Sequence, residues 1–420
     1  MLEDACSNND PLGCGATPWL QLESHLRFDA TRPLLGDLCS RGHWVACLGK
    51  AWTLSQLPLS PGHPTRDALG YAEAEQMFSG LCQKGIQRAC LDGALLALVS
   101  PGKREGATVR IQELCERGEL RACAYFVEQA VLEKRVESKR GAWFELASKA
   151  CEGGVPRGCR LKGVFKGNGQ GVLMDRAEAG KEFNRGCNGG DMISCRLLAE
   201  QYAKGRGVTR SRQKAAVLLD RGCIGGDMES CKELGLLHLS GKGVPQNARQ
   251  GNAYLEKSCQ GGVLESCTHL GWSHQEGRGL QVNLNRANEL FRRSCEGGHA
   301  LGCGYWGWNL SKSGTKEAEA QEANGLLERA CNAGISFACN VLGTRLERGI
   351  GTPIMTRKAL ETYAQGCAVL DEDACKNLGR LGSDPSHEET LGNSLKTLER
   401  ACSKGVDSAC QVRARIVDSP

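Results

Sequence analysis

Twenty-four cysteines at a fixed spacing constrain the fold of this chain more than any other feature. They form twelve pairs with seven residues between the two members, and no cysteine is left over. The first members are Cys6, Cys39, Cys82, Cys115, Cys151, Cys187, Cys223, Cys259, Cys295, Cys331, Cys367 and Cys402, and the second members are Cys14, Cys47, Cys90, Cys123, Cys159, Cys195, Cys231, Cys267, Cys303, Cys339, Cys375 and Cys410. From Cys151 to Cys367 the first members recur every 36 residues. This period indicates an array of small repeats rather than the roughly three globular domains typical of such a length.

Each cysteine pair predicts a reversal of the chain. Within one straight helix, residues eight apart are separated by about 12 Å of rise, whereas the Cα atoms of a disulfide lie about 5.5–6 Å apart. Ten pairs have a glycine three residues after the first cysteine, as Gly226 follows Cys223. Such a glycine can end a helix in the left-handed conformation. We therefore predict that the first cysteine closes one helix, that the second opens the next, and that each pair is a nearest-neighbour disulfide.

Metal binding and reduced thiols are the alternatives for these cysteines. Zinc sites typically place two to four residues between paired cysteines, whereas seven intervene here and the chain has only 8 histidines. We predict neither a metal nor a cofactor. Reduced thiol pairs in the cytosol stay an alternative, but a fully paired count favours an oxidising, extracytoplasmic compartment: periplasmic, cell-surface or secreted. The first residues, Met1 to Cys6, lack an export signal, so we expect a processed chain.

The residues between the pairs predict two amphipathic helices per unit. In one copy Leu234, Leu237 and His238 follow the helical period, and Gly241 and Gly243 then predict a turn. The second helix of a unit carries a stripe that ends beside the next first cysteine, such as Ala287, Leu290, Phe291 and Ser294 before Cys295. A small residue next to each cysteine, such as Ser294, lets two helices approach closely.

The fold class predicted from this pattern is all-α. Because neither helix buries its stripe alone, neighbouring units are expected to stack into an α/α solenoid of about eleven helix-turn-helix repeats. We assign residues 1–420 to a single solenoid, with irregular repeats over 1–150, regular 36-residue repeats over 151–410 and a C-terminal cap over 411–420. At Cys367 the terminating glycine is absent, so we expect that turn to be built differently.

The repeated run of Leu-Gly, a Gly-x-Gly-Val turn and an Ala/Gly-Cys-x-x-Gly ending resembles the SEL-one-like repeat, a relative of the tetratricopeptide repeat. With C-x7-C in every unit, the chain is similar to the Helicobacter cysteine-rich protein family, and the mitochondrial cytochrome c oxidase assembly factor seven has a similar cysteine frame. The resemblance to the Helicobacter cysteine-rich family implies penicillin or muropeptide binding, or weak β-lactamase activity. The resemblance to the mitochondrial assembly factor implies a redox or haem assembly factor of the intermembrane space.

The sequence offers little support for an enzyme. Ser100 with Lys103, and Ser211 with Lys214, match the Ser-x-x-Lys element of serine β-lactamases, but the Ser-Asp-Asn and Lys-Thr-Gly elements are missing. Gly241-Lys242-Gly243 lacks the Ser/Thr and the preceding strand of a phosphate-binding loop, so turn glycines explain it better. We therefore predict a protein without enzymatic activity, with β-lactamase-type activity as the alternative.

A candidate binding surface follows from the position five residues after the second cysteine. Trp272 and Trp308 occupy it in neighbouring units, and Tyr305 and Trp306 lie close by in sequence. First helices of helical repeats line the concave surface, so these residues are expected to bind a partner there, although aromatic packing at the seams between repeats is the alternative. The residue directly after the second cysteine is basic in four units: Arg160, Arg196, Lys232 and Lys376. These side chains are expected either to lie along the edge of the concave surface or to form a row of solvated charges.

The net charge and the hydropathy of the chain argue against nucleic acid as a partner and against a membrane span. The net charge of +5, from 53 Lys+Arg against 48 Asp+Glu, is too small for a nucleic-acid-binding footprint, and no apolar run is long enough to span a membrane. The leading prediction is an extracytoplasmic scaffold that binds a protein or peptide in the concave groove of a disulfide-locked array. The alternatives are the cell-wall fragment binder or weak β-lactamase and the mitochondrial intermembrane-space assembly factor.

Overall fold

A computed structural model describes residues 36–37, 39–40, 42, 44–55, 68–98, 100, 102–135, 140–313, 317–382 and 388–417. Over these residues the chain is helical and has no strand, which confirms the all-α prediction. The helices are α4 (Trp44–Ser55), α5 (Ala68–Gln83), α6 (Gln87–Leu98), α7 (Arg104–Glu116), α8 (Leu120–Leu132), α9 (Arg140–Glu152), α10 (Pro156–Asn168), α11 (Arg176–Asn188), α12 (Met192–Lys204), α13 (Arg212–Ile224), α14 (Met228–Ser240), α15 (Ala248–Gln260), α16 (Leu264–Glu276), α17 (Leu284–Glu296), α18 (Ala300–Ser313), α19 (Glu317–Asn332), α20 (Ser336–Arg348), α21 (Thr356–Ala368), α22 (Glu372–Gly382), α23 (Glu388–Ser403) and α24 (Asp407–Val417).

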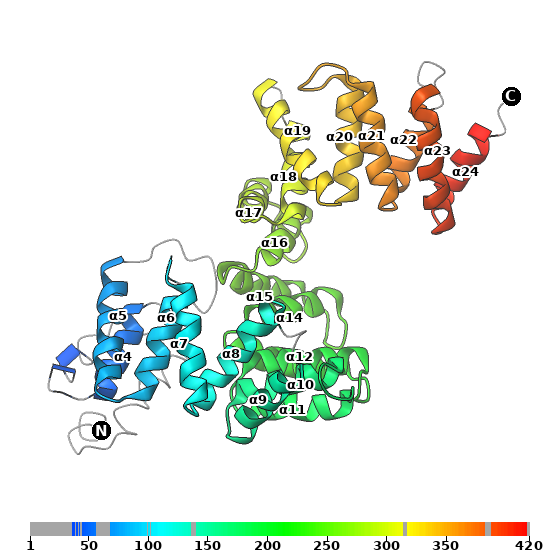
Figure 1. The fold of residues 1–420 in the computed structure, drawn as a ribbon. Helices are drawn as coiled ribbons and strands as arrows, with labels where there is room; N and C mark the ends of the chain where they lie inside the picture. Colours follow the sequence, from blue (N-terminus) through cyan, green and yellow to red (C-terminus); the bar gives the residue numbers. More distant parts are fainter. Residues whose placement is uncertain are drawn as a thin grey trace. The chain divides into compact units, whose positions relative to one another are not determined.

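The helices pack in consecutive pairs within two compact units, Met1–Gln246 and Asn247–Pro420. In the first unit α10 packs on α11 and α12 on α13. In the second unit α16 packs on α17 and α18 on α19 (Figure 1). These are the helix-turn-helix repeats that the sequence predicts. The division into irregular, regular and capping segments stays a prediction.

A left-handed glycine makes the reversal within ten of the eleven described cysteine pairs, as predicted. Gly226 has φ +91°, and its N–H donates to the carbonyl of Cys223 at 3.3 Å. The next N–H, that of Asp227, donates to the carbonyl of Gly222 at 2.9 Å, so the last carbonyls of α13 keep hydrogen-bond partners. The ten glycines at this position have φ between +80° and +96°: Gly42, Gly85, Gly118, Gly154, Gly190, Gly226, Gly262, Gly298, Gly334 and Gly405.

The expectation of a different turn after Cys367 is wrong. Leu370 takes the glycine position with φ +70°, and its N–H donates to the carbonyl of Cys367 at 2.9 Å. A leucine pays a steric penalty in this left-handed region, yet the packing of α21 against α22 holds the same reversal. Here the surrounding helices override the local preference of the residue.

Eleven cysteine pairs are described, and each is a nearest-neighbour disulfide with its two Cα atoms 4.4–4.8 Å apart. They run from Cys39–Cys47 to Cys402–Cys410, and no free cysteine occurs in the described part of the chain. The pair Cys6–Cys14 lies outside the described residues. Each described bridge ties the last turn of one helix to the first turn of the next.

From Cys151 onward, the small residue before each cysteine permits a very close approach of the two helices, whereas Leu81 and Leu114 hold this position before Cys82 and Cys115. A Cβ atom on Gly222 would lie 2.4 Å from the hydroxyl oxygen of Ser230, and one on Gly186 would lie equally close to that of Ser194. Where both positions hold serine, their hydroxyls form a hydrogen bond, as in Ser258 and Ser266 at 2.8 Å. The joint thus consists of a disulfide with a tight contact of small side chains next to it.

The Gly-x-Gly pairs are turn glycines. Gly205 and Gly207 have φ +69° and +74°, and a Cβ atom on Gly207 would lie 2.4 Å from the carbonyl carbon of Arg176 at the start of α11. The second glycine therefore both turns the chain and makes room for the preceding repeat. The predicted stripe of the second helix is also confirmed, because Ala287, Leu290 and Phe291 of α17 are buried.

Candidate functional site

Two tryptophans lie on neighbouring first helices of the second unit. Trp272 of α16 and Trp308 of α18 are half-buried. A cation lies near each ring: the guanidinium of Arg278 is 5.6 Å from the ring centroid of Trp272, and the ammonium of Lys312 is 3.3 Å from that of Trp308. We call Trp272, Trp308, Arg278 and Lys312 the tryptophan surface.

A side-chain network holds the helices beneath the tryptophan surface together. The amide of Asn309 donates to Gln275 on α16 at 3.0 Å and to Asn288 on α17 at 2.7 Å. Asn309 directly follows Trp308, and Gln275 lies on the same helix as Trp272. The two tryptophans are therefore carried by helices joined through this amide network, which favours a rigid spacing between them.

Tyr305 and Trp306 have different surroundings from Trp272 and Trp308. The ring of Tyr305 lies between those of Phe291 and Phe337, with centroid distances of 5.1 Å to each, and burial raises the pKa of the Tyr305 hydroxyl. Trp306 packs against the buried cluster that includes Leu327. Both residues thus contact the aromatic and aliphatic interior of this unit, as the seam-packing alternative describes.

The basic residues after the second cysteines do not form a free row. Arg160 is only 7% exposed, and it donates from Nη2 to Glu128 at 2.6 Å and from Nε to Asp191 at 2.7 Å. Arg196 is paired with Asp227 at 2.9 Å, Lys232 with Glu229, and Lys376 with Asp373. The prediction that these residues rim a binding face or form a solvated row is wrong for Arg160, because ionic partners bury it.

The partner of Arg160 and of Arg196 lies in the next repeat. Asp191 and Asp227 each immediately precede a first helix, α12 and α14, and each lies 31 residues after its arginine. In the second unit Thr268 and His299 keep the same separation and form a hydrogen bond of 3.0 Å. In the sequence, an arginine followed 31 residues later by an aspartate occurs in both repeats, and this pattern could have predicted the two ion pairs.

The Glu128 carboxylate makes the stability of the first unit dependent on pH. Burial by itself would raise the pKa of Glu128, but the guanidinium groups of Arg157 and Arg160 outweigh burial and hold it below its usual value. A lowered pKa contributes stability above the pKa of the unfolded chain, and this stability is lost as the pH falls through the folded pKa. We expect urea midpoints of the wild type to fall more steeply between about pH 5 and 3 than those of Glu128→Gln. Parallel pH profiles would contradict this.

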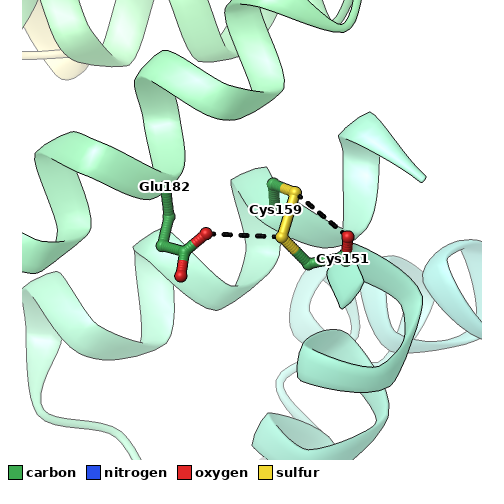
Figure 2. A group of neighbouring side chains, drawn as sticks. All are labelled: Cys151, Cys159 and Glu182. Atoms are coloured by element: carbon green, nitrogen blue, oxygen red, sulfur yellow. Dashed lines mark hydrogen bonds between the residues drawn. A yellow bond between two sulfur atoms is a disulfide. The ribbon is translucent and has the colours of Figure 1, made fainter. Parts of the chain in front are cut away.

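One group of side chains in the described part of the chain has the composition of a metal site. Cys151, Cys159 and Glu182 place their sulfur and carboxylate atoms within 4.8 Å of one another. Figure 2 shows Glu182 directed at the disulfide, with its Oε2 3.3 Å from the Sγ of Cys151. Metal ions bind cysteine as the thiolate, and both sulfurs here are bonded to each other in the disulfide. The Glu182 carboxylate in turn forms an ion pair with Lys162 at 3.2 Å. The group is therefore a charged contact on a disulfide.

The two Ser-x-x-Lys matches have structural roles. The hydroxyl of Ser211 accepts a hydrogen bond from the backbone N–H of Lys214 at 3.3 Å, so it caps α13, while the Lys214 ammonium lies over the ring of Tyr202. The hydroxyl of Ser100 donates to a backbone carbonyl, and Lys103 pairs with Glu75 at 2.6 Å. Neither lysine is placed to activate its serine.

A sequence model of the Sel1 repeat matches three consecutive segments, residues 193–227, 229–263 and 264–299. The chain contains Sel1 repeats. Each matched segment begins within or next to a first helix, α12, α14 or α16, and runs into the next cysteine joint. No curated protein matches the chain. None of the described helices is both long and apolar enough to cross a bilayer.

Solved structures share the Sel1 repeat fold. A Sel1 repeat protein from Oxalobacter formigenes is similar over 58% of this chain and 96% of its own, with 16% identity and a TM-score of 0.51. A protective antigen of uropathogenic Escherichia coli strains, described as displaying an SLR fold, covers 93% of this chain and 91% of its own, with 18% identity and a TM-score of 0.45. At these identities the likeness to the Oxalobacter protein supports the fold alone.

Proposed function

We propose that this Sel1 repeat protein is an extracytoplasmic scaffold that binds a peptide segment of a partner protein through the tryptophan surface. The observation that carries the proposal is the pair of half-buried indoles, Trp272 and Trp308, at equivalent positions of joined first helices. Rigid aromatic side chains bury a large area at a small entropic cost, which is why they dominate binding hot spots. The disulfide at every described joint supports an oxidising compartment.

The chemistry beside the indoles indicates the kind of peptide. Arg278 and Lys312 place positive charge near both rings, so a segment with an apolar or aromatic side chain next to a carboxylate would be complementary. The β-lactamase alternative requires an activated nucleophile, and Ser211 instead caps a helix. Binding of a cell-wall fragment needs no nucleophile and stays an alternative. The haem and redox assembly alternative rests on the similar cysteine frame alone.

Selection of random displayed peptides on the purified protein tests the proposal. We expect the selected peptides to combine apolar and acidic residues, and the double variant Trp272→Ala/Trp308→Ala to bind them roughly tenfold or more weakly. Lys312→Glu, which changes an exposed side chain, should also weaken them while leaving the melting temperature unchanged. Affinities measured by calorimetry, with circular dichroism on each variant, separate lost binding from lost folding.

A tryptophan outside the surface provides the control. Trp143 of α9 is half-buried against Phe126, with ring centroids 5.1 Å apart, in the other unit. Trp143→Ala removes the same indole area and should leave peptide affinity at the wild-type value. The binding surface lies elsewhere if the selected peptides bind the double tryptophan variant and the Lys312→Glu variant as tightly as they bind the wild type.

A further inference from the structure

One repeat position brings a side chain against the disulfide of the preceding unit. It lies five residues before a first cysteine and holds leucine in several units, such as Leu146, which packs with the cluster containing Cys115, and Leu326, which packs with the one containing Cys295. In two units it is charged, with opposite signs. Arg110 lies five residues before Cys115, and Glu182 lies five residues before Cys187.

Both charged side chains contact a disulfide sulfur. Nη2 of Arg110 is 3.3 Å from the Sγ of Cys82, and Oε2 of Glu182 is 3.3 Å from the Sγ of Cys151. The same repeat position thus places a cation against one disulfide and a carboxylate, itself paired with Lys162, against the other.

The two disulfides also differ in accessibility. Cys82 at the end of α5 and Cys90 in α6 are half-buried, and the side chain of Arg110 is exposed. Cys151 and Cys159 have 0% and 2% of their surface exposed. The first pair is therefore the more accessible to a reductant in solution, whereas the second pair is enclosed.

We infer that Cys82–Cys90 is a thiol–disulfide exchange site that a dithiol reductant opens before the other described disulfides, with Arg110 stabilising the leaving thiolate. Exchange is faster when the departing sulfur is a better-stabilised thiolate, and a neighbouring guanidinium provides that stabilisation. Exposure and a cation next to the sulfur thus act in the same direction at Cys82. This inference does not depend on the proposed peptide binding.

The reaction balances with the dithiol as the sole reductant. A thiolate of the dithiol attacks the Sγ of Cys90, the Cys82–Cys90 bond breaks, and Cys82 leaves as a thiolate beside Arg110. The second thiol of the reductant then attacks the mixed disulfide at its own sulfur and releases Cys90. Two electrons pass to the protein, which gains two thiols after protonation, and the dithiol becomes a cyclic or intramolecular disulfide.

Other half-buried disulfides provide the comparison that isolates the effect of charge. Cys39–Cys47 and Cys402–Cys410 are half-buried like Cys82–Cys90. If exposure alone determined the rate of reduction, these two disulfides would be reduced as fast as Cys82–Cys90. Cys151–Cys159, buried and next to the Glu182 carboxylate, is expected to be among the last to open.

The experiment is a time course of partial reduction on the full chain. The native protein is incubated with dithiothreitol, quenched with acid, labelled with N-ethylmaleimide and mapped by mass spectrometry, while circular dichroism monitors helicity. We expect Cys82 and Cys90 to be labelled first among the described cysteines while helicity is retained. Arg110→Gln should slow their labelling by about threefold, the effect of about one unit in the pKa of the leaving thiol.

Two further variants make the outcome decisive. Arg110→Lys keeps a positive charge and should restore most of the rate, and Arg117→Gln removes an exposed charge elsewhere on the same helical segment and should change nothing. Labelling of all pairs at one rate, earlier labelling of Cys39–Cys47 or Cys402–Cys410, or an unchanged rate in Arg110→Gln would each overturn the inference.

Discussion

Replacement of Arg160 by leucine is expected to destabilise the protein by about 3–5 kcal/mol. Arg160 is buried between Glu128 on α8 and Asp191 at the start of α12, so it links three successive first helices of the first unit. In the variant Glu128 retains Arg157, but Asp191 loses its charge partner in a site where water replaces it poorly. The cost of a buried charge without its partner exceeds the apolar gain from the leucine.

Arg196→Leu is the matched control for this prediction. Arg196 occupies the same repeat position and pairs with the equivalent residue, Asp227, but its side chain is 25% exposed and makes this single ionic contact. Solvent screens the pair at Arg196, and Asp227 keeps hydrogen bonds from the hydroxyl and backbone N–H of Ser230 at 2.6 and 3.1 Å, so the loss of the pair should cost about 1 kcal/mol. Urea unfolding with the disulfides intact measures both values. Equal destabilisation by the two substitutions would mean that burial of Arg160 is not what makes its contacts strong.

Gly222→Ala is expected to destabilise the protein by about 3 kcal/mol, although alanine is the better helix former. The new Cβ atom would lie 2.4 Å from the hydroxyl oxygen of Ser230 and 2.9 Å from its Cβ atom. Because the adjacent Cys223–Cys231 disulfide fixes the two helices to each other, they cannot move apart to relieve the clash. The steric cost therefore outweighs the roughly 1 kcal/mol that helix propensity contributes.

The control for Gly222 is a helical glycine without neighbours. Gly325 in α19 is exposed, and nothing lies within 4 Å of the position that its Cβ atom would take. Gly325→Ala should therefore stabilise the protein by about 0.5–1 kcal/mol. Thermal or urea unfolding of the two variants should give shifts of opposite sign. Stabilisation by Gly222→Ala would show that the two helices of this joint are free to separate.

The periodic features of the chain were predictable because each depends on residues close in sequence. The cysteine spacing, the glycine of each reversal, the turn glycines and the buried stripe of α17 all follow from local backbone conformation and the helical period. Leu370 marks the limit of such local rules. It adopts the left-handed conformation of the missing glycine because the packed helices impose it.

The candidate site was predictable only in part. The position of Trp272 and Trp308 on neighbouring first helices follows from the repeat, but the contact of Trp306 with the interior, two residues before Trp308, does not. Residues two apart on a helix point about 200° apart around its axis, and which of these directions faces the core depends on the helices that pack around α18. The repeat pattern does not specify that packing at a single position.

The sequence by itself determined the repeat, the reversal of the chain at each described joint and the disulfide there, because these depend on residues that lie close together in sequence, such as two cysteines eight positions apart. Only the tertiary structure decided that Arg160 is buried against Asp191 and that Arg110 and Glu182 lie against the disulfides of preceding units. Those contacts join residues about thirty positions apart, and the stacking of one repeat on the next brings them within hydrogen-bonding distance. Side-chain length and direction then set which charge meets which partner.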